Sequence, residues 1–204
     1  MSFQPPNSLA GSSHPSQSLS EGAEYSADER RLLLLVAHDA VDSLVLKHAP
    51  GQESPGSHLE EPRGVFTTLY LHGKLRGCVG YVVPVLPLHR AVFETARAAA
   101  SQDSRFTPVT PDEVGDLQVS LSILSPLFPI EAAQVEIGRH GLVLTSGPRR
   151  GLLLPQVPVE HGWSREEFLE QTCRKAGLYP DAWKSGATLE AFTAEVFGDP
   201  GAPD

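Results

Sequence analysis

The sequence predicts an α+β fold in which helices flank a mixed or antiparallel β-sheet. Three observations support this class. Apolar residues recur at helical spacing after Ser26 and again after Pro87. Apolar and polar residues alternate in the segment 117–124, which is typical of a half-buried strand. Helix and strand signals follow one another without a strict strand–helix–strand rhythm, which favours α+β over a parallel α/β sheet.

Three helices are predicted from their start and stop signals. Ser26 and Ser164 each precede a glutamate three residues later, which is the spacing of a capping box. The first of these helices is expected to end near His48 and the other at Gly177. Pro87 marks the start of the remaining helix, because its fixed φ suits a first helical turn. Four alanines near the end of that helix make it slim, which predicts close packing against a sheet or another helix.

The strand signals comprise one hairpin and several single segments. Residues 65–71 are rich in β-branched and aromatic side chains, and His72-Gly73 supplies a tight turn into a second arm that ends at Tyr81. The other strands are expected at 117–124, 135–137, 142–145, 152–157 and 189–197, with turns at 138–141 and 147–151. Pro155 interrupts the segment 152–157, which suggests an edge or a bulge.

The 204 residues are enough for one large domain or two small ones with a proper core. Residues 1–25 are rich in Ser, Pro, Gly and Gln, so we expect a disordered tail there. The folded domain is expected over 26–199, followed by a C-terminal tail at 200–204. Within the domain, residues 49–63 carry three prolines, two glycines and no apolar rhythm, which predicts a loop.

Charge and cysteine content exclude several classes of function. The net charge of −9 argues against nucleic-acid binding, which needs a basic face. The two cysteines, Cys78 and Cys173, make no disulfide framework and indicate a reducing compartment. Cys173 falls on the apolar stripe of the helix after Ser164 and is expected in the core. No apolar run is long enough to span a membrane, and the first 24 residues lack the apolar stretch of a signal peptide. We therefore expect a cytoplasmic protein that binds neither nucleic acid nor a membrane.

The hexapeptide Leu75-Arg76-Gly77-Cys78-Val79-Gly80 is the most informative functional signal. Side chains alternate along a strand, so Arg76 and Cys78 are expected on one face. The glycines leave the thiol open to a ligand or to another backbone, and a nearby arginine favours the thiolate. Cys78 is therefore a candidate catalytic nucleophile, with His140 or His72 as its base. The alternative is a small buried hydrophobe that fits beside glycines.

Five further positions are candidates for substrate binding. Arg105 can grip a carboxylate or phosphate with Asp103 orienting it, or the two can form an ion pair that fixes the end of a helix. His140, in a glycine-flanked turn, is either an anion-binding or proton-carrying residue or a turn residue with a wet ring. Arg76 and Gly77 complete the set. The histidines show no paired ligand spacing and no Cys-x-x-Cys occurs, so no zinc site is expected, and the cofactor stays unknown.

Five separate blocks of the chain resemble the AMMECR-one domain family, in its prokaryotic type, protein A of the AmmeMemoRadiSam system. The blocks are Gly64-Val65-Phe66-Thr67-Thr68-Leu69, the hexapeptide at 75–80, residues 98–106, Gly151-Leu152-Leu153-Leu154-Pro155-Gln156-Val157, and residues 168–178. They cover roughly 26–199, and Val79 stands where the family more often has Ile. The resemblance implies a two-part α+β fold, with the Arg-Gly-Cys segment beside a cleft between the parts.

The resemblance leaves the biochemical activity open but implies partners. In prokaryotes such proteins are encoded beside a Memo-like protein, related to extradiol dioxygenases, and a radical SAM protein, which implies a shared pathway or complex. The first interpretation is a binding component of that pathway, whose cleft receives a partner segment or a small-molecule ligand. The alternative is a cysteine-dependent enzyme that acts on a small anionic or modified substrate through Cys78.

Overall fold

The computed structural model describes residues 23–51 and 55–203, and it consists of two four-stranded sheets with helices packed on each. The strand orders are β2-β1-β3-β8 and β4-β7-β5-β6, and every neighbouring pair is antiparallel. The predicted two-part α+β fold is therefore confirmed, with antiparallel sheets. None of the described helices combines the length and the apolar character needed to cross a membrane.

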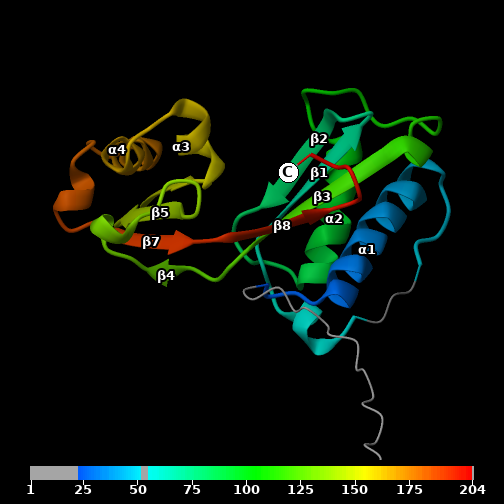
Figure 1. Cartoon of the computed structure of the whole chain (residues 1–204), viewed down its shortest axis with the longest axis horizontal. Helices are drawn as coiled ribbons and strands as arrows, with labels where there is room; N and C mark the ends of the chain where they lie inside the picture. The colour runs from blue at the N-terminus through cyan, green and yellow to red at the C-terminus, as the bar shows by residue number, and fades with distance from the viewer. Residues whose placement is uncertain (1–22, 52–54, 204) are drawn as a thin grey trace, which may run out of the picture.

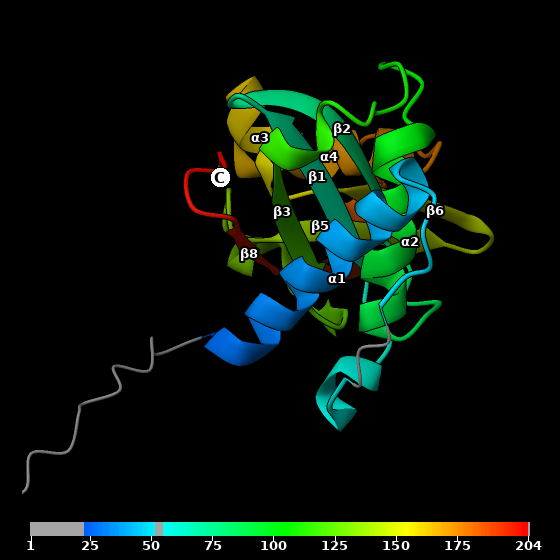
Figure 2. The same ribbon diagram turned by 90° about the vertical axis from the view of Figure 1, so that its right-hand side faces the viewer.

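The first part contains the N-terminal half of the chain and its last strand. Its elements are α1 (Ala27–Val45), β1 (Val65–Leu71), β2 (Lys74–Tyr81), α2 (Leu88–Ser101), β3 (Leu117–Leu124) and β8 (Ala194–Gly198). In Figures 1 and 2, α1 and α2 lie together on one face of this sheet. The helices bury the largest apolar cluster of the molecule against β1 and β3, and the hydroxyls of Thr67 and Thr95 meet inside it at 2.7 Å.

The second part is inserted between β3 and β8. Its elements are β4 (Phe128–Pro129), β5 (Gly141–Ser146), β6 (Arg149–Leu153), α3 (Gln156–His161), α4 (Arg165–Lys175) and β7 (Thr188–Phe192). Helix α4 packs on β5 and β6, with Phe168 and Cys173 fully buried beneath it. The prediction that Cys173 belongs to the core is confirmed, and burial raises the pKa of its thiol.

Local signals predicted the element starts correctly. Both capping boxes form, because Ser26 and Ser164 each accept the N–H of the glutamate three residues on. The hairpin turn at His72-Gly73 is also confirmed, with φ values of 50° and 74°. Helix α1 ends at Val45, close to the expected end near His48.

One predicted strand is absent, and a second predicted strand and a predicted turn have other bounds in the structure. Residues 135–137 follow a short 3-10 helix, Ala132–Gln134, and form no strand. The segment 152–157 divides at Pro155, where β6 has ended and α3 begins, because proline suits a first helical turn. The turn expected at 147–151 is shorter, and Gly151 belongs to β6, where a Cβ would lie 2.4 Å from the backbone nitrogen of Ala176.

The strand expected at 189–197 is two strands in different sheets. β7 ends at Phe192 and β8 begins at Ala194, so the chain leaves the second sheet and enters the first at Thr193 (Figure 1). Next to it, the segment that leads from β3 to β4 crosses in the other direction. Ser125 N–H donates to the Thr193 carbonyl at 2.9 Å, and Thr193 N–H donates to Ser125 Oγ at 3.0 Å. These two bonds tie the crossings together.

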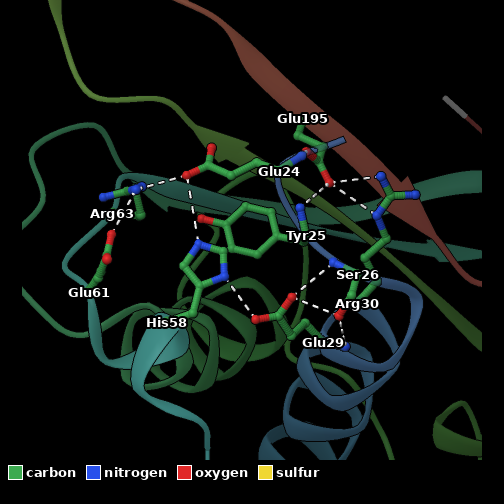
Figure 3. A network of polar contacts seen from close by, with 9 residues as sticks. All are labelled: Glu24, Tyr25, Ser26, Glu29, Arg30, His58, Glu61, Arg63 and Glu195. Atoms are coloured by element: carbon green, nitrogen blue, oxygen red, sulfur yellow. Dashed lines mark hydrogen bonds and ion pairs between the residues drawn. The ribbon is translucent and has the colours of Figure 1, made fainter. Parts of the chain in front are cut away.

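The predicted N-terminal tail extends too far by at least one residue. Residues 1–22 lie outside the described part of the chain, but Tyr25 is only 2% exposed and belongs to the core of the first part. Its ring stacks on His58, with ring centroids 4.9 Å apart (Figure 3). His58 comes from a 3-10 helix, Ser57–Glu60, inside the segment predicted as a plain loop. Tyr25 was assigned to the tail because the polar residues before it dominate the local composition.

The C-terminal tail predicted at 200–204 is also packed in part. The Pro200 carbonyl accepts a hydrogen bond from Gln118 Nε2 at 3.0 Å, and Ala202 N–H donates to the Asp199 carbonyl at 3.0 Å. After β8 the chain therefore continues beside the start of β3 and then turns at residues 199–202. Asp204 lies outside the described residues.

Charged side chains fasten the segment around Tyr25 to three other elements. Glu24 reaches Arg63 at 2.8 Å, and its own N–H donates to Glu195 on β8 at 2.7 Å. His58 Nδ1 meets Glu29 Oε1 at 2.8 Å, as Figure 3 shows. Burial raises the pKa of Tyr25 to about 12, and the negative charge of Glu24 adds to the shift. The residues just before α1 are thus an integral part of the fold.

We expect Tyr25→Ala to lower the free energy of unfolding by about 3–5 kcal/mol, the usual cost of removing a buried aromatic ring. Tyr25→Phe is the matched control. The phenol oxygen is buried and has no hydrogen-bond partner among the described residues, so its removal should change stability by less than about 1 kcal/mol. Urea unfolding monitored by circular dichroism measures both. Equal stability of Tyr25→Ala and the wild type would contradict a structural role for this segment.

Candidate functional site

The candidate site begins with an irregularity in β2. The pairing register with β1 shifts so that Leu69 lies opposite Gly77 while Tyr70 lies opposite Leu75, which leaves Arg76 as the extra residue of a β-bulge. A bulge breaks the alternation of side chains, and the Arg76 guanidinium turns to Glu113, with Nε at 2.9 Å from Oε1. It also donates to the backbone carbonyls of Thr107 and Pro108. None of the described contacts of the Arg76 guanidinium is with the Cys78 thiol, although the two side chains were expected on one face.

Arg76 instead holds the loop after α2 against the hairpin. Its Nη2 donates to Glu113 Oε2 at 3.0 Å, so the ion pair is bidentate. Together with a backbone hydrogen bond from Thr110, this pairing lowers the pKa of Glu113 to about 2. All the described contacts of the guanidinium serve this loop.

The Cys78 side chain faces the space between the two parts. Its sulfur accepts a hydrogen bond from the Thr68 hydroxyl at 3.3 Å, because Thr68 lies directly opposite Cys78 on β1. The thiol is half-buried and lines a cavity of about 110 Å³. The other lining residues come from both parts: Phe66, Thr68, Ser122, Leu124, Leu154, Gln156 and Ala194. The cleft implied by the family resemblance corresponds to this composite cavity.

Asp103 fixes the backbone of Cys78. β2 is an edge strand, so its outward N–H groups have no strand partner, and the N–H of Cys78 donates to Asp103 Oδ2 at 2.9 Å. Arg105 grips the same carboxylate through Nε and Nη2, at 3.0 and 2.7 Å. The bonds from Arg105 hold the pKa of Asp103 well below its usual range, although burial opposes the shift.

Arg105 and the backbone N–H of Cys78 share the Asp103 carboxylate. The Arg105 side chain is 56% exposed, whereas the Asp103 side chain is 6% exposed. The pKa of Arg105 is raised mainly by its hydrogen bonds to Asp103, with a smaller contribution from Cys78. Because Nε and one N–H of Nη2 are occupied by Asp103, the opposite edge of the guanidinium has no partner among the described residues. That edge is available to an anion.

Gly77 serves packing rather than ligand contact. A Cβ on Gly77 would lie 2.2 Å from the Ala99 carbonyl oxygen of α2, so only glycine lets the helix approach the strand this closely. The alanine-rich end of α2 completes the fit, as the slim helix predicted. Gly80 likewise leaves room for the ring of Phe66.

Neither histidine proposed as a base lies at the thiol. His140 is 7% exposed, accepts the Glu136 N–H at its Nδ1 and packs edge-on against Phe128 in the second part. Its predicted wet ring is therefore wrong, and burial lowers its pKa. His72 is exposed at the hairpin turn, 4.0 Å from Asp116. The predicted pairing of Arg105 with Asp103 forms, but His140 does not take part in it.

Sequence reasoning missed Thr68 and Gln156, whose polar side chains line the Cys78 cavity. Thr68 could have been found, since the hairpin register places it opposite Cys78. Gln156 lies in one of the blocks that carry the family resemblance, which was a usable signal. Among residues 23–51 and 55–203, no group of three or more His, Cys, Asp or Glu side chains is arranged to hold a metal ion.

The fold and this geometry define a class of α+β proteins in which two antiparallel sheets meet and a cysteine, fixed by an Asp–Arg pair, faces the junction. The chain belongs to the AMMECR1 family, whose model matches residues 34–197. This confirms the family suggested by the five blocks.

Archaeal relatives and a solved structure support the assignment. A protein of Thermococcus gammatolerans is 46% identical over 160 residues, which are 72% of this chain and 78% of the relative. One from Methanothermobacter thermautotrophicus is 41% identical over 193 residues, 88% and 98% of the two chains. The crystal structure of the uncharacterized protein PH0010 from Pyrococcus horikoshii is 39% identical, with a TM-score of 0.65, over 85% of this chain and 93% of that one. These names state no ligand or reaction.

We expect Gly77→Ala to destabilise the protein by about 1–3 kcal/mol, because the new methyl group collides with the backbone of α2. Gly115→Ala is the control, since a Cβ there meets nothing within 4 Å and the change should stay within about 0.5 kcal/mol. Thermal or urea unfolding compares the two. If Gly77→Ala were as stable as the wild type, the close approach of α2 to β2 would not constrain this position.

We expect Asp103→Asn to lower stability at pH 7 by about 1–3 kcal/mol, since it weakens hydrogen bonds from Arg105 and Cys78. The folded-state pKa of Asp103 is depressed, so its contribution is complete above about pH 4, the unfolded value, and is lost as pH falls below it. The difference between wild type and variant should therefore shrink between pH 5 and pH 2. Asp112→Asn, on the exposed surface, is the control, and a pH-independent difference for Asp103→Asn would refute the assignment.

Proposed function

We propose that the protein is a binding component of a pathway shared with a Memo-like protein and a radical SAM protein, and that its binding site is the cavity at Cys78. A small ligand, or a short segment of a partner, enters between the two parts. The proposal follows the family membership and the construction of the site. Its ligand carries an anionic group that the free edge of Arg105 recognises.

The arrangement of Asp103 and Arg105 carries this proposal. A half-exposed guanidinium held on one edge by a buried carboxylate is pre-organised, so little side-chain entropy is lost when an anion binds the other edge. An ion pair that served stability alone would gain little from so exposed an arginine. Thr68, Ser122 and Gln156 supply hydrogen-bonding groups to the cavity at Cys78.

A cysteine-dependent enzyme is the second candidate. The Cys78 sulfur accepts a hydrogen bond from the Thr68 hydroxyl and lines the cavity, so a ligand in the cavity has access to the thiol. The described residues bring no histidine to the thiol, however, so an activating base of the usual kind would have to come from the substrate or from a partner. This is why binding is the stronger proposal.

We expect the full chain to form a complex with the Memo-like protein, the radical SAM protein or both, taken from the same organism. Isothermal titration calorimetry measures the affinity of the wild type, Arg105→Gln and Arg174→Gln. Arg105→Gln should weaken binding at least tenfold, whereas Arg174→Gln, an exposed position on α4, should not. No complex with either protein would refute the partner proposal, and equal affinities of all three variants would refute the assigned site.

Alkylation of Cys78 by iodoacetamide, followed by mass spectrometry across pH 5–9, separates binding from catalysis. Cys78→Ser is expected to keep its partner if the thiol only lines the site. Rapid alkylation that persists at pH 6, together with loss of a measurable turnover in Cys78→Ser, would favour the enzyme instead. Cys173 is fully buried and provides an internal reference for an unreactive thiol.

A further inference from the structure

A second cavity lies at the junction of the two parts, separate from Cys78. Its volume is about 240 Å³, and its walls come from the ends of β1, β2 and β3 in the first part and from β6 and β7 in the second. Leu124 lines both this cavity and the smaller one at Cys78. Leu124 belongs to a buried apolar cluster with Val143 and Phe192, and Phe192 also lines the larger cavity.

The cavity is apolar and rigid. Val82, Leu124 and Phe192 line its interior, and Val83 and Leu127, which also line it, are 50% and 38% exposed. Three further lining residues are Pro62, Pro84 and Pro126. Prolines have a fixed φ and no N–H group, so this part of the wall is stiff and offers no backbone donor to water. Exposed apolar side chains around a preformed hollow are typical of a ligand site.

Two arginines line the cavity, and they differ in their pairing. Arg63 is neutralised, because its Nη2 lies 2.8 Å from Glu24 and 2.9 Å from Glu61. Arg150, on β6, is exposed, and no described residue gives it a hydrogen bond or an ion pair. The lining of the cavity therefore contains one guanidinium, that of Arg150, with which no described carboxylate pairs. A net charge of −9 on the whole chain disfavours a polyanion, so a single negative charge is the better complement.

The volume limits the size of the ligand. An apolar cavity of about 150 Å³ holds benzene, so about 240 Å³ accommodates a ring or a branched aliphatic chain with one small polar group. A nucleotide is too large and too highly charged. We infer that this cavity binds a small apolar carboxylic acid, whose hydrocarbon part packs on Leu124 and Phe192 and whose carboxylate pairs with Arg150. This site is independent of the proposed function of Cys78.

The test uses the full chain and two pairs of probes of equal shape: phenylacetate with phenylacetamide, and 4-methylpentanoate with 4-methylpentanamide. Ligand-observed NMR and calorimetry measure binding. We expect at least one of the two carboxylates to bind. The affinity of the matching neutral amide should be at least tenfold lower, and added salt should reduce the difference between the two affinities. Arg150→Gln should reduce carboxylate affinity at least tenfold. Arg149→Gln, the neighbouring arginine, whose guanidinium bonds the Gly177 carbonyl, should leave affinity unchanged.

The outcomes are decisive in each direction. Binding of a carboxylate that Arg150→Gln abolishes, in a variant with unchanged circular dichroism and thermal midpoint, supports the site. If acid and amide bind with equal affinity, or if Arg150→Gln binds the carboxylate as tightly as the wild type, the proposed pairing of the carboxylate with Arg150 is overturned. Failure of both carboxylates to bind at 10 mM overturns the ligand class. Cys78→Ser should retain this affinity, so the result stands whether or not the Cys78 site is correctly assigned.

Discussion

The paired hydrogen bonds between Ser125 and Thr193 are the joint on which the arrangement of the molecule depends. In the described residues the chain passes between the two sheets twice, once after β3 and once before β8. The crossings run side by side, since Leu124 pairs with Ala194 on one side of the joint and Phe128 with Ala191 on the other. The two bonds keep this ribbon continuous while it changes sheets, and thereby set where the second part lies against the first.

Both cavities follow from that joint, because neither is complete within one part. Cys78 and Thr68 come from the hairpin of the first sheet, whereas Leu154 and Gln156 come from the connection between β6 and α3. The apolar cluster beside the joint depends on the same contact. A Cβ on Gly141 would lie 2.2 Å from the Phe192 ring, so glycine is required for that ring to pack at the junction.

The parts of this structure that sequence predicted best are those that depend on neighbours along the chain. A capping box needs only Ser164 and the glutamate three residues later, and a hairpin turn needs only His72 and Gly73. The failures have distant causes. The division of 189–197 into two strands involves a hydrogen bond between Thr193 and the distant residue Ser125. The burial of Tyr25 involves stacking on His58, which lies far from it in the sequence. Apolar periodicity carries no information about either.

The candidate site shows the same division between local and distant causes. The fork of Asp103 and Arg105 was predictable, because the two residues are separated by one position at the end of a helix. The role of Arg76 was not, because a bulge depends on the register with another strand. The sequence shows that Arg76 is close to Cys78 along the chain, but it does not show that the guanidinium pairs with Glu113.

Charge pairing therefore separates structural from functional arginines in this protein. Arg76 and Arg63 have their carboxylates within 3 Å and hold loops and the N-terminal segment in place. Arg105 is paired on one edge only, and Arg150 has no described partner. An exposed guanidinium without a full set of partners contributes little to folding, so its N–H donors stay available to an incoming anion. Arg150 lines a cavity at the junction between the sheets, where a ligand can contact both parts at once, whereas Arg105 shares the Asp103 carboxylate with the backbone of Cys78.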